Sequence, residues 1–462
     1  MGWTRRPRCP TGKPWNGCGT TAPCSGCSTC TTSSPIRSCR TSPGCGTGYS
    51  TGISPTGAKT AHRCTGHRTS PQSGAGNCSP KRSTSHTESC GRASRWPSGE
   101  RSRAVDHLPD FAELAARATP ADFRDDPLPG WAGLGTLFGA PAARLDELGQ
   151  VDGWAVAAVP FDGTASSRPG AAEGPRALRT ASVVFANSLA SLGTWEMLDT
   201  RTGEAFRYVA PQVVDVGDLH VYPTDTFRTY QAVAAESRSL CARAGRVIFL
   251  NGDHSTTFAT FSGFRAAQLD RAAGRRIGFV NIDHHFDFGR WSALHGALYH
   301  GSNSRRISEL PGMRPEDIAF VGVGDTTRFD QFRSLVEQGF QVVPAARIMR
   351  TGADAALRPV VERLAAVCDA VYVSLDIDVL DTAAVTGTGH VTMGGLQVAH
   401  LLDVYEVLRE LPIGALDVAE IAPRYDPTGA TAQVVARLLF EFLFRTGRHD
   451  PGLPHWRFDE GG

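Results

Sequence analysis

Beyond Pro127, short apolar runs rich in Val and Ile alternate with longer amphipathic segments. The apolar runs predict eight β-strands, at Trp154–Val159, Val213–Val216, Val247–Leu250, Ile277–Ile282, Ile318–Val323, Gln341–Val343, Val371–Leu375 and Ala415–Val418. Helical spacing of apolar residues predicts helices between them, for example at Arg228–Ala244, Thr257–Ala273, Ala353–Val367, Leu396–Leu411 and Ala430–Phe444. The alternation predicts a three-layer α/β/α fold, with helices on both faces of a mostly parallel sheet of about eight strands.

Clusters of polar residues directly follow four of the predicted strands. In parallel sheets, functional side chains gather beyond the carboxyl ends of the strands. The four strings that carry such clusters are VIFLNGDHS, GFVNIDHHFDFG, AVYVSLDIDVLD and GALDVAEIAPRYDPTGAT. We therefore expect the chemistry of the chain to lie in these strings.

The second string places Asp283, His285 and Asp287 at alternate positions. In an extended chain these three side chains share one face, and burying them together is unfavourable without a partner such as a cation. By the same argument Asp376 and Asp378 of the third string share a face, and their carboxylates repel unless a cation lies between them. A solvated loop with helix caps is the alternative interpretation of both strings.

With His254 of the first string, these residues supply two imidazoles and four carboxylates, enough for two metal ions that share a carboxylate. This ligand set favours Mn²⁺, with Fe, Co, Ni or Zn as further candidates. Two ions lower the pKa of a bridging water, so the set predicts hydrolysis by metal-bound hydroxide. Glu420 of the fourth string is not needed as a ligand and is free to hold a cationic substrate. A structural role for His254 and a surface or capping role for Glu420 are the alternatives.

Composition divides the chain near residue 104. Residues 1–103 contain no Leu, Val, Phe or Asp, carry a net charge of +13 and hold ten of the twelve cysteines, whereas the remainder carries −12. A segment so poor in large apolar residues cannot form an ordinary core. We therefore expect residues 1–103 to be disordered or not part of the native protein, for instance translated from a start codon set too far upstream. Residues 104–462 are expected to form the catalytic domain.

Three other interpretations of residues 1–103 stay open. The thiolates of Cys24, Cys27 and Cys30 are spaced closely enough to bind one metal ion, the ten cysteines are enough for a disulfide framework, and 15 Lys and Arg residues can bind nucleic acid. The body, with only Cys241 and Cys368, has the composition of a reduced, intracellular protein. Because no apolar run is long enough for a membrane span, we expect a cytoplasmic protein without a membrane partner, whose catalytic domain binds no nucleic acid.

From about Val151 to Phe444 the strings resemble the ureohydrolases, the family of arginase and agmatinase. NGDHS stands where the family has Gly-Gly-Asp-His-Ser, NIDHHFD where it has Asp-Ala-His-x-Asp, and SLDIDVLD where it has Ser-x-Asp-x-Asp-x-x-Asp. VPFDGTASSRPGAAEGPRALR is similar to the family's opening strand, loop and helix. The resemblance implies an arginase-like fold and a hydrolase that converts a guanidino group to urea and an amine at two divalent ions per chain, with Mn²⁺ as the expected metal.

The resemblance also assigns six metal ligands. His254 and Asp287 would bind the first ion, and His285 and Asp378 would bind the second. Asp283 and Asp376 would bridge the two ions. His300, in YHGSNSRRI, resembles a motif whose imidazole moves protons to the leaving amine, so His300 and Asp287 are the expected catalytic residues. Glu420, in LDVAEIAP, matches the carboxylate that binds the guanidinium. Relatives form trimers or hexamers, so we expect a homo-oligomer.

Several departures from the family pattern bear on the substrate. Asn251, His284, Thr382 and VTGTG replace the family's Gly, Ala, Pro and Ala-Pro-Gly-Thr-Gly; none removes a ligand, but they can alter substrate choice or rate. Arginases hold the amino-acid head group partly through Asn and Thr or Ser side chains, and the corresponding loop here, FGRWSALHGALY, lacks the Asn and Thr.

This loop favours an agmatinase-like reaction, in which agmatine is cleaved to urea and putrescine, a step of polyamine biosynthesis. Arg290 of the same loop could instead pair with the carboxylate of a guanidino acid substrate. Guanidinobutyrate, guanidine itself and a specialised-metabolism amidine therefore stay open as substrates.

Two other classes compete with a ureohydrolase. Zn-dependent deacetylases share the fold and use one Zn held by an Asp-His-Asp set, whereas His254 and Asp378 supply a second set here. Two ions per chain would favour urea release, and one Zn would favour amide cleavage. The altered loops also suggest a non-catalytic homologue, but retaining the complete ligand set with His300 and Glu420 argues against it.

Overall fold

The computed structural model describes residues 135–190, 194–324 and 326–457. All of them belong to one unit of the chain, His107–Gly462. The expectations for residues 1–103, including their disorder and its alternatives, lie outside the described residues, as does the expected start of the catalytic domain at residue 104.

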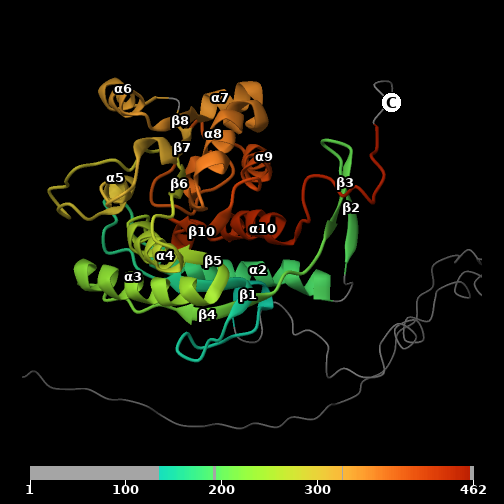
Figure 1. Cartoon of the computed structure of the whole chain (residues 1–462), viewed down its shortest axis with the longest axis horizontal. Coiled ribbons are helices and arrows are strands. Elements are labelled where there is room, and N and C mark those ends of the chain that lie inside the picture. The colour runs from blue at the N-terminus through green and yellow to red at the C-terminus, as the bar shows by residue number, and fades with distance from the viewer. Residues whose placement is uncertain (1–134, 191–193, 325, 458–462) are drawn as a thin grey trace, which may run out of the picture. The chain divides into compact units, whose positions relative to one another are not determined.

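Eight strands form one sheet in which all neighbouring strands run parallel (Figure 1). In chain order they are β1 (Val151–Val159), β4 (Val213–Asp218), β5 (Ala244–Asn251), β6 (Ile277–Ile282), β7 (Ile318–Val323), β8 (Gln341–Pro344), β9 (Ala370–Asp376) and β10 (Ile413–Ala419). All eight predicted strands are present, and the predicted fold class is confirmed. Across the sheet the order is β4-β1-β5-β10-β9-β6-β7-β8.

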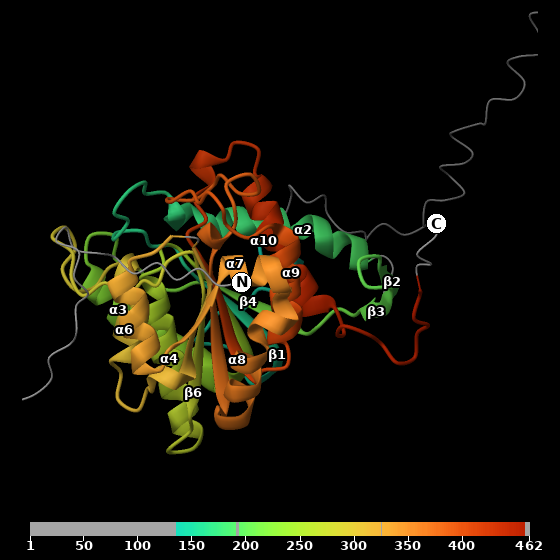
Figure 2. The same cartoon turned by 90° about the horizontal axis from the view of Figure 1, so that it is seen from above.

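Helices cover both faces of the sheet (Figure 2). Alternate side chains of β1 point to opposite faces, so Val156 and Ala158 join one apolar core whereas Ala155 and Ala157 join the other. The helices that pack on the first core are α2 (Gly174–Ala190), α7 (Ala345–Thr351), α8 (Ala353–Val367), α9 (Val398–Leu408) and α10 (Ala430–Phe444). Those on the second are α3 (Thr226–Arg243), α4 (Thr256–Arg271), α5 (Asn303–Ser308) and α6 (Phe329–Gln338). The described residues also form short 3-10 helices: η1 (Leu137–Gly139), η2 (Ala171–Glu173), η3 (His300–Ser302), η4 (Pro315–Asp317), η5 (Ile377–Val379) and η6 (Pro423–Tyr425).

All five helices expected from periodicity are present; α8 and α10 have the predicted bounds, and the ends of α3, α4 and α9 differ by up to three residues. An antiparallel hairpin of β2 (Trp195–Asp199) and β3 (Glu204–Tyr208) was not predicted, and it forms a separate two-stranded sheet. A bridge joins Tyr208 of this hairpin to Arg445 at the end of α10. None of the described helices combines the length and apolar character needed to cross a lipid bilayer.

The four strands that precede the polar clusters are neighbours at the centre of the sheet, in the order β5, β10, β9 and β6. The chain makes β6, β7 and β8 first and then returns to insert β9 and β10 between β6 and β5. The register places Leu375 opposite Ile282 and Ala419 opposite Asp376. The four polar clusters therefore meet at one edge of the sheet, where ligands of open α/β sheets bind.

Candidate metal centre and substrate cavity

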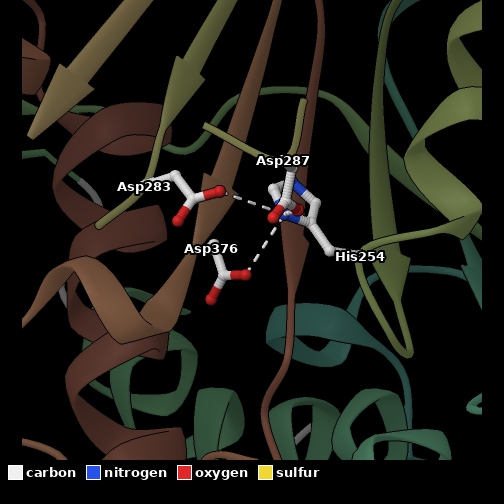
Figure 3. A group of neighbouring side chains, drawn as sticks. All are labelled: His254, Asp283, Asp287 and Asp376. Carbon is white, nitrogen blue, oxygen red and sulfur yellow. Dashed lines mark ion pairs between the residues drawn. The ribbon is translucent and has the colours of Figure 1, made fainter. Parts of the chain in front are cut away.

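His254 lies just after β5 and is fully buried. Its Nδ1 atom lies 2.9 Å from Oδ2 of Asp287, 3.1 Å from Oδ2 of Asp376 and 3.4 Å from Oδ2 of Asp283. Figure 3 shows the three carboxylates around this imidazole. The ligand atoms of these four residues lie close enough together to hold one metal ion.

A second group of ligand atoms shares Asp283 with the first. The Nδ1 atom of His285 lies 3.1 Å from Oδ2 of Asp378 and 3.5 Å from Oδ1 of Asp283, and these three residues are also close enough to hold an ion. Asp283 thus presents one oxygen to each group, as a bridging carboxylate does. His285 is half exposed, whereas Asp283 and Asp378 are buried.

Turns bring these side chains together, whereas the sequence argument assumed an extended chain. Asp287 has a left-handed backbone with a φ of 45°. Asp376 ends β9, and its carboxylate accepts the N–H of Asp378, which lies in η5; Asp283 accepts the N–H of His285 in the same way. The expectation of a shared face was therefore wrong in its geometry, because side-chain-to-backbone hydrogen bonds set the conformation beyond the strand ends.

The buried carboxylates repel one another and make this cluster a favourable place for positive charge. Burial and the charge of Asp283 raise the pKa of Asp287, and they raise the pKa of Asp378 to about 6. Burial and the charges of Asp378 and Asp283 hold the pKa of Asp376 well above its usual range. Burial opposes the charged form of His254, but the surrounding carboxylates outweigh it and raise the pKa of this imidazole.

The residues present fit a pair of divalent cations. Oδ1 of Asp378 is buried without a hydrogen-bond partner among the described residues, although buried polar atoms normally have one. Nδ1 of His254 is buried among three carboxylate oxygens at 2.9–3.4 Å. Carboxylate oxygens with some imidazole nitrogen suit Mn²⁺ and related ions. Asp376 belongs to the first group alone, so its bridging role stays a prediction, as do the other five ligand assignments.

A buried hydrogen-bond network holds His254 from the side of the sheet. Its Nε2 atom lies 2.9 Å from Oγ of Ser374, and that hydroxyl donates to Oδ1 of Asp417 at 2.6 Å. Tyr372 and Asn251 donate to Oδ2 of Asp417 at 2.6 and 3.1 Å. Because the Ser374 hydroxyl donates to Asp417, its oxygen accepts a hydrogen bond from Nε2–H of His254. With this proton on Nε2, Nδ1 is the nitrogen at which a cation would replace the second proton, as a metal ligand requires.

A cavity of about 390 Å³ lies over both groups. Six of the predicted site residues line it: His285, Asp287, His300, Asp376, Asp378 and Glu420. None of its described lining residues is Lys or Arg. The cavity is therefore suited to a cationic group at its acidic end.

Glu420 and His300 lie together in this cavity. Oε1 of Glu420 accepts the N–H of His254 at 2.9 Å and lies 3.3 Å from Nδ1 of His300. Glu420 lines the cavity, and a Cβ on Gly389 would lie 3.4 Å from its Oε2 atom, an ordinary van der Waals contact. Burial disfavours the charged form of His300, but the hydrogen bond and charge of Glu420 outweigh it and raise the pKa of His300 to about 9.

Sequence reasoning missed two neighbours of His300. Oγ of Ser166 lies 2.7 Å from Nε2 of His300, and the ring of His390 stacks on the His300 ring with centroids 5.5 Å apart. Ser166 lies in the Gly/Pro-rich loop after β1, and His390 directly follows VTGTG. Both strings were noted from the sequence, but only the structure brings them to the same imidazole.

Arg290, the residue that would suit a carboxylate, is exposed and does not line the cavity, although the adjacent Gly289 does. Ser292 and Gly296 pair across the tip of this loop. Trp291 and Leu294 of the tip are largely exposed. The loop therefore flanks the cavity without placing a cation in it.

The sequence matches the model of the arginase family over residues 152–445, a span that includes all the site residues named above. It is 30% identical over 286 residues to the mitochondrial guanidino acid hydrolase of Homo sapiens, covering 62% of this chain and 76% of that protein. It is also 30% identical over 288 residues to the mitochondrial agmatinase of Gallus gallus, covering 62% of this chain and 78% of that protein. Among solved structures, a hypothetical agmatinase from Burkholderia thailandensis is similar, with a TM-score of 0.54 and 26% identity over 68% of this chain and 91% of that one.

Proposed function

The chain belongs to the arginase family, and from this premise we propose that it hydrolyses a guanidino group to urea and an amine at a pair of divalent cations. The observation that carries the proposal is the convergence of two ligand groups, joined by Asp283, on one cavity. His254, Asp287 and Asp376 would complete the site of one ion, and His285 and Asp378 that of the other. When bound, such a pair activates water for attack on an electron-poor carbon.

Glu420 is proposed to bind the substrate guanidinium. Its side chain lines the cavity, and its Oε1 atom accepts the N–H of His254. A charged guanidinium donates paired hydrogen bonds to a carboxylate, which fixes the plane of the group. The guanidino carbon would then lie over the acidic cluster, where the oxygen of water attacks it.

His300 is proposed to protonate the leaving amine. The reaction forms a carbon–oxygen bond to water and breaks the bond from that carbon to the alkyl-substituted nitrogen, which must gain a proton to leave. Nδ1 of His300 faces Glu420, and the backbone N–H of Ser166 points at Nε2 at 3.3 Å; we propose that Nε2 of the protonated ring is the atom that releases the proton. Oγ of Ser166, 2.7 Å from Nε2, keeps this nitrogen hydrogen-bonded.

Agmatine is the substrate that the cavity favours. A guanidino acid carries a carboxylate at its far end, and the described cavity lining offers it no Lys or Arg. Agmatine carries an amine there, for which neutral polar side chains such as Gln331 and Thr327 suffice. A guanidino acid is the second candidate, because Arg290 follows Gly289, which lines the cavity, and because one similar protein is a guanidino acid hydrolase by name.

The test is a urea-release assay on Mn-loaded protein with agmatine, guanidinobutyrate, guanidine and arginine, and with an acetylated polyamine assayed for acetate. We expect urea from agmatine with the highest kcat/KM. Preference for guanidinobutyrate would support the second candidate. Acetate release by protein that holds one Zn per chain would support a deacetylase, and no turnover of any compound would contradict the proposed function.

We further propose that residues 104–462 form the catalytic domain of a cytoplasmic homo-oligomer, a trimer or hexamer. Two similar proteins are mitochondrial by name, so cell fractionation is the measurement for the compartment, and light scattering for the assembly. Comparing the full chain with one that starts near Ala104 tests the N-terminal segment. Loss of activity in the shorter chain would contradict the proposal that residues 1–103 are not part of the catalytic domain.

A further inference from the structure

Three imidazoles lie in a row along the cavity wall. The ring of His390 stacks on His300 with centroids 5.5 Å apart and an interplanar angle of 27°. On its other side, His390 contacts His285. The centroids of these two rings lie 5.9 Å apart, and the angle between the ring planes is 70°. All three side chains line the cavity. His390 thus separates the expected proton donor from an expected metal ligand.

The two residues before His390 are anchored by contacts with other parts of the chain. Arg168 donates hydrogen bonds to the carbonyl oxygens of Thr388 at 2.7 Å and Gly389 at 3.2 Å, and it lies over the ring of Tyr425. Thr388 also pairs with Ile421 in an isolated bridge. Because the two residues before His390 are held in this way, its ring has a defined position against His300.

The contacts of His300 explain why a ring on its face matters. Ser166 meets Nε2 and Glu420 meets Nδ1, and hydrogen bonds to ring nitrogens lie near the plane of the ring. Two such contacts define an axis through the two nitrogens, and they resist tilting of the ring about this axis only weakly. A flat group packed on the face of the ring restrains that tilt directly.

We propose that His390 is a positioning residue, which holds the plane of the His300 imidazole so that Nε2 points at the leaving nitrogen. This inference rests on the proposed function for its kinetic consequence. The ring face is what acts, so another flat aromatic side chain at position 390 should serve. His390 needs no proton transfer of its own in this role.

The test compares His390→Ala and His390→Phe in the full-length, Mn-loaded protein, with His220→Ala as a matched loss of an imidazole. His220 is largely exposed, pairs with Glu236 and does not line the cavity. We expect His390→Ala to lower kcat by about 3- to 10-fold, the range of an aromatic pair, with KM and metal content unchanged. His390→Phe should recover most of kcat, and His220→Ala should match the unmodified chain.

A kcat unchanged in His390→Ala would overturn the proposal, and so would a loss that His390→Phe does not recover while metal content stays constant. Crystal structures of the unmodified chain and of His390→Ala give a readout that does not depend on turnover. We expect the His300 ring to tilt or to lose a single orientation in the variant. If no compound releases urea, the proposed function fails, and an unchanged His300 ring in His390→Ala would then overturn the positioning role separately.

Discussion

Nδ1 of His254 lies 2.9 Å from Oδ2 of Asp287, although the two residues follow different strands, β5 and β6. These strands are not neighbours, because β10 and β9 lie between them. The loop after β6 turns at Asp287, where φ is 45°, and this turn brings the carboxylate to His254. A metal ion bound by both residues would link the ends of two strands that are not neighbours. Removing one of its ligands therefore tests the arrangement of the strands as well as the metal site.

Asp378→Asn should lower the metal content from two ions to one per chain. Asp378 belongs only to the second ligand group, and replacing a carboxylate by an amide removes the negative charge that a divalent cation needs. Elemental analysis of protein loaded with Mn²⁺ and then dialysed measures the loss. Asp330→Asn, at an exposed carboxylate paired with Arg328, is the control, and retention of two ions by Asp378→Asn would refute the assignment.

Glu420→Gln should weaken substrate binding and leave both ions in place. A hydrogen bond to a charged group contributes about 1.5–3 kcal/mol, so we expect kcat/KM for agmatine to fall about 10- to 100-fold. Steady-state kinetics with parallel metal analysis measures both effects. A variant that loses metal as well as activity would instead make Glu420 part of the metal site.

His300 should titrate near pH 9 in metal-free protein, since Glu420 raises its pKa to about 9. Its ordinary value is about 6.5, so the pair stabilises the folded state fully below pH 6.5. This contribution is lost as the pH rises through 9. NMR titration of the ring measures the pKa, which should fall in Glu420→Gln; an unchanged pKa in that variant would show that another group holds the charge.

Ser374→Ala should weaken the first metal site without removing any ligand. The hydroxyl of Ser374 connects Nε2 of His254 to Asp417, and loss of such outer partners costs about 10- to 100-fold in metal affinity. Titration with Mn²⁺ should show one site weakened and the other unchanged. Ser262→Ala, at a hydroxyl bonded to the backbone of α4, is the matched control, and equal affinities in the two variants would contradict the role of Ser374.

The sequence predicts the central strands of the main sheet well because they are continuous apolar runs buried on both faces, as β6 and β9 are. It does not predict the hairpin of β2 and β3, whose strands are short and only partly buried. The sequence also did not predict the order of the strands, because the residues of β9 and β10 carry no signal that these strands insert between β5 and β6.

For the site, the polar strings after the strands were sufficient to nominate the residues but not their geometry. Asp283 and Asp287 converge through turns that the alternate spacing does not reveal. Ser166 and His390 touch His300 from segments far away in the chain. Contacts of this kind depend on the packing of loops, which carries no periodic signal in sequence.

Two adjacent divalent cations are expected to bind between these side chains. Anomalous diffraction from crystals soaked in Mn²⁺ would locate both ions. We predict two peaks, one among His254, Asp283, Asp287 and Asp376 and the other among Asp283, His285 and Asp378. A single peak, or peaks elsewhere, at saturating Mn²⁺ would contradict the account.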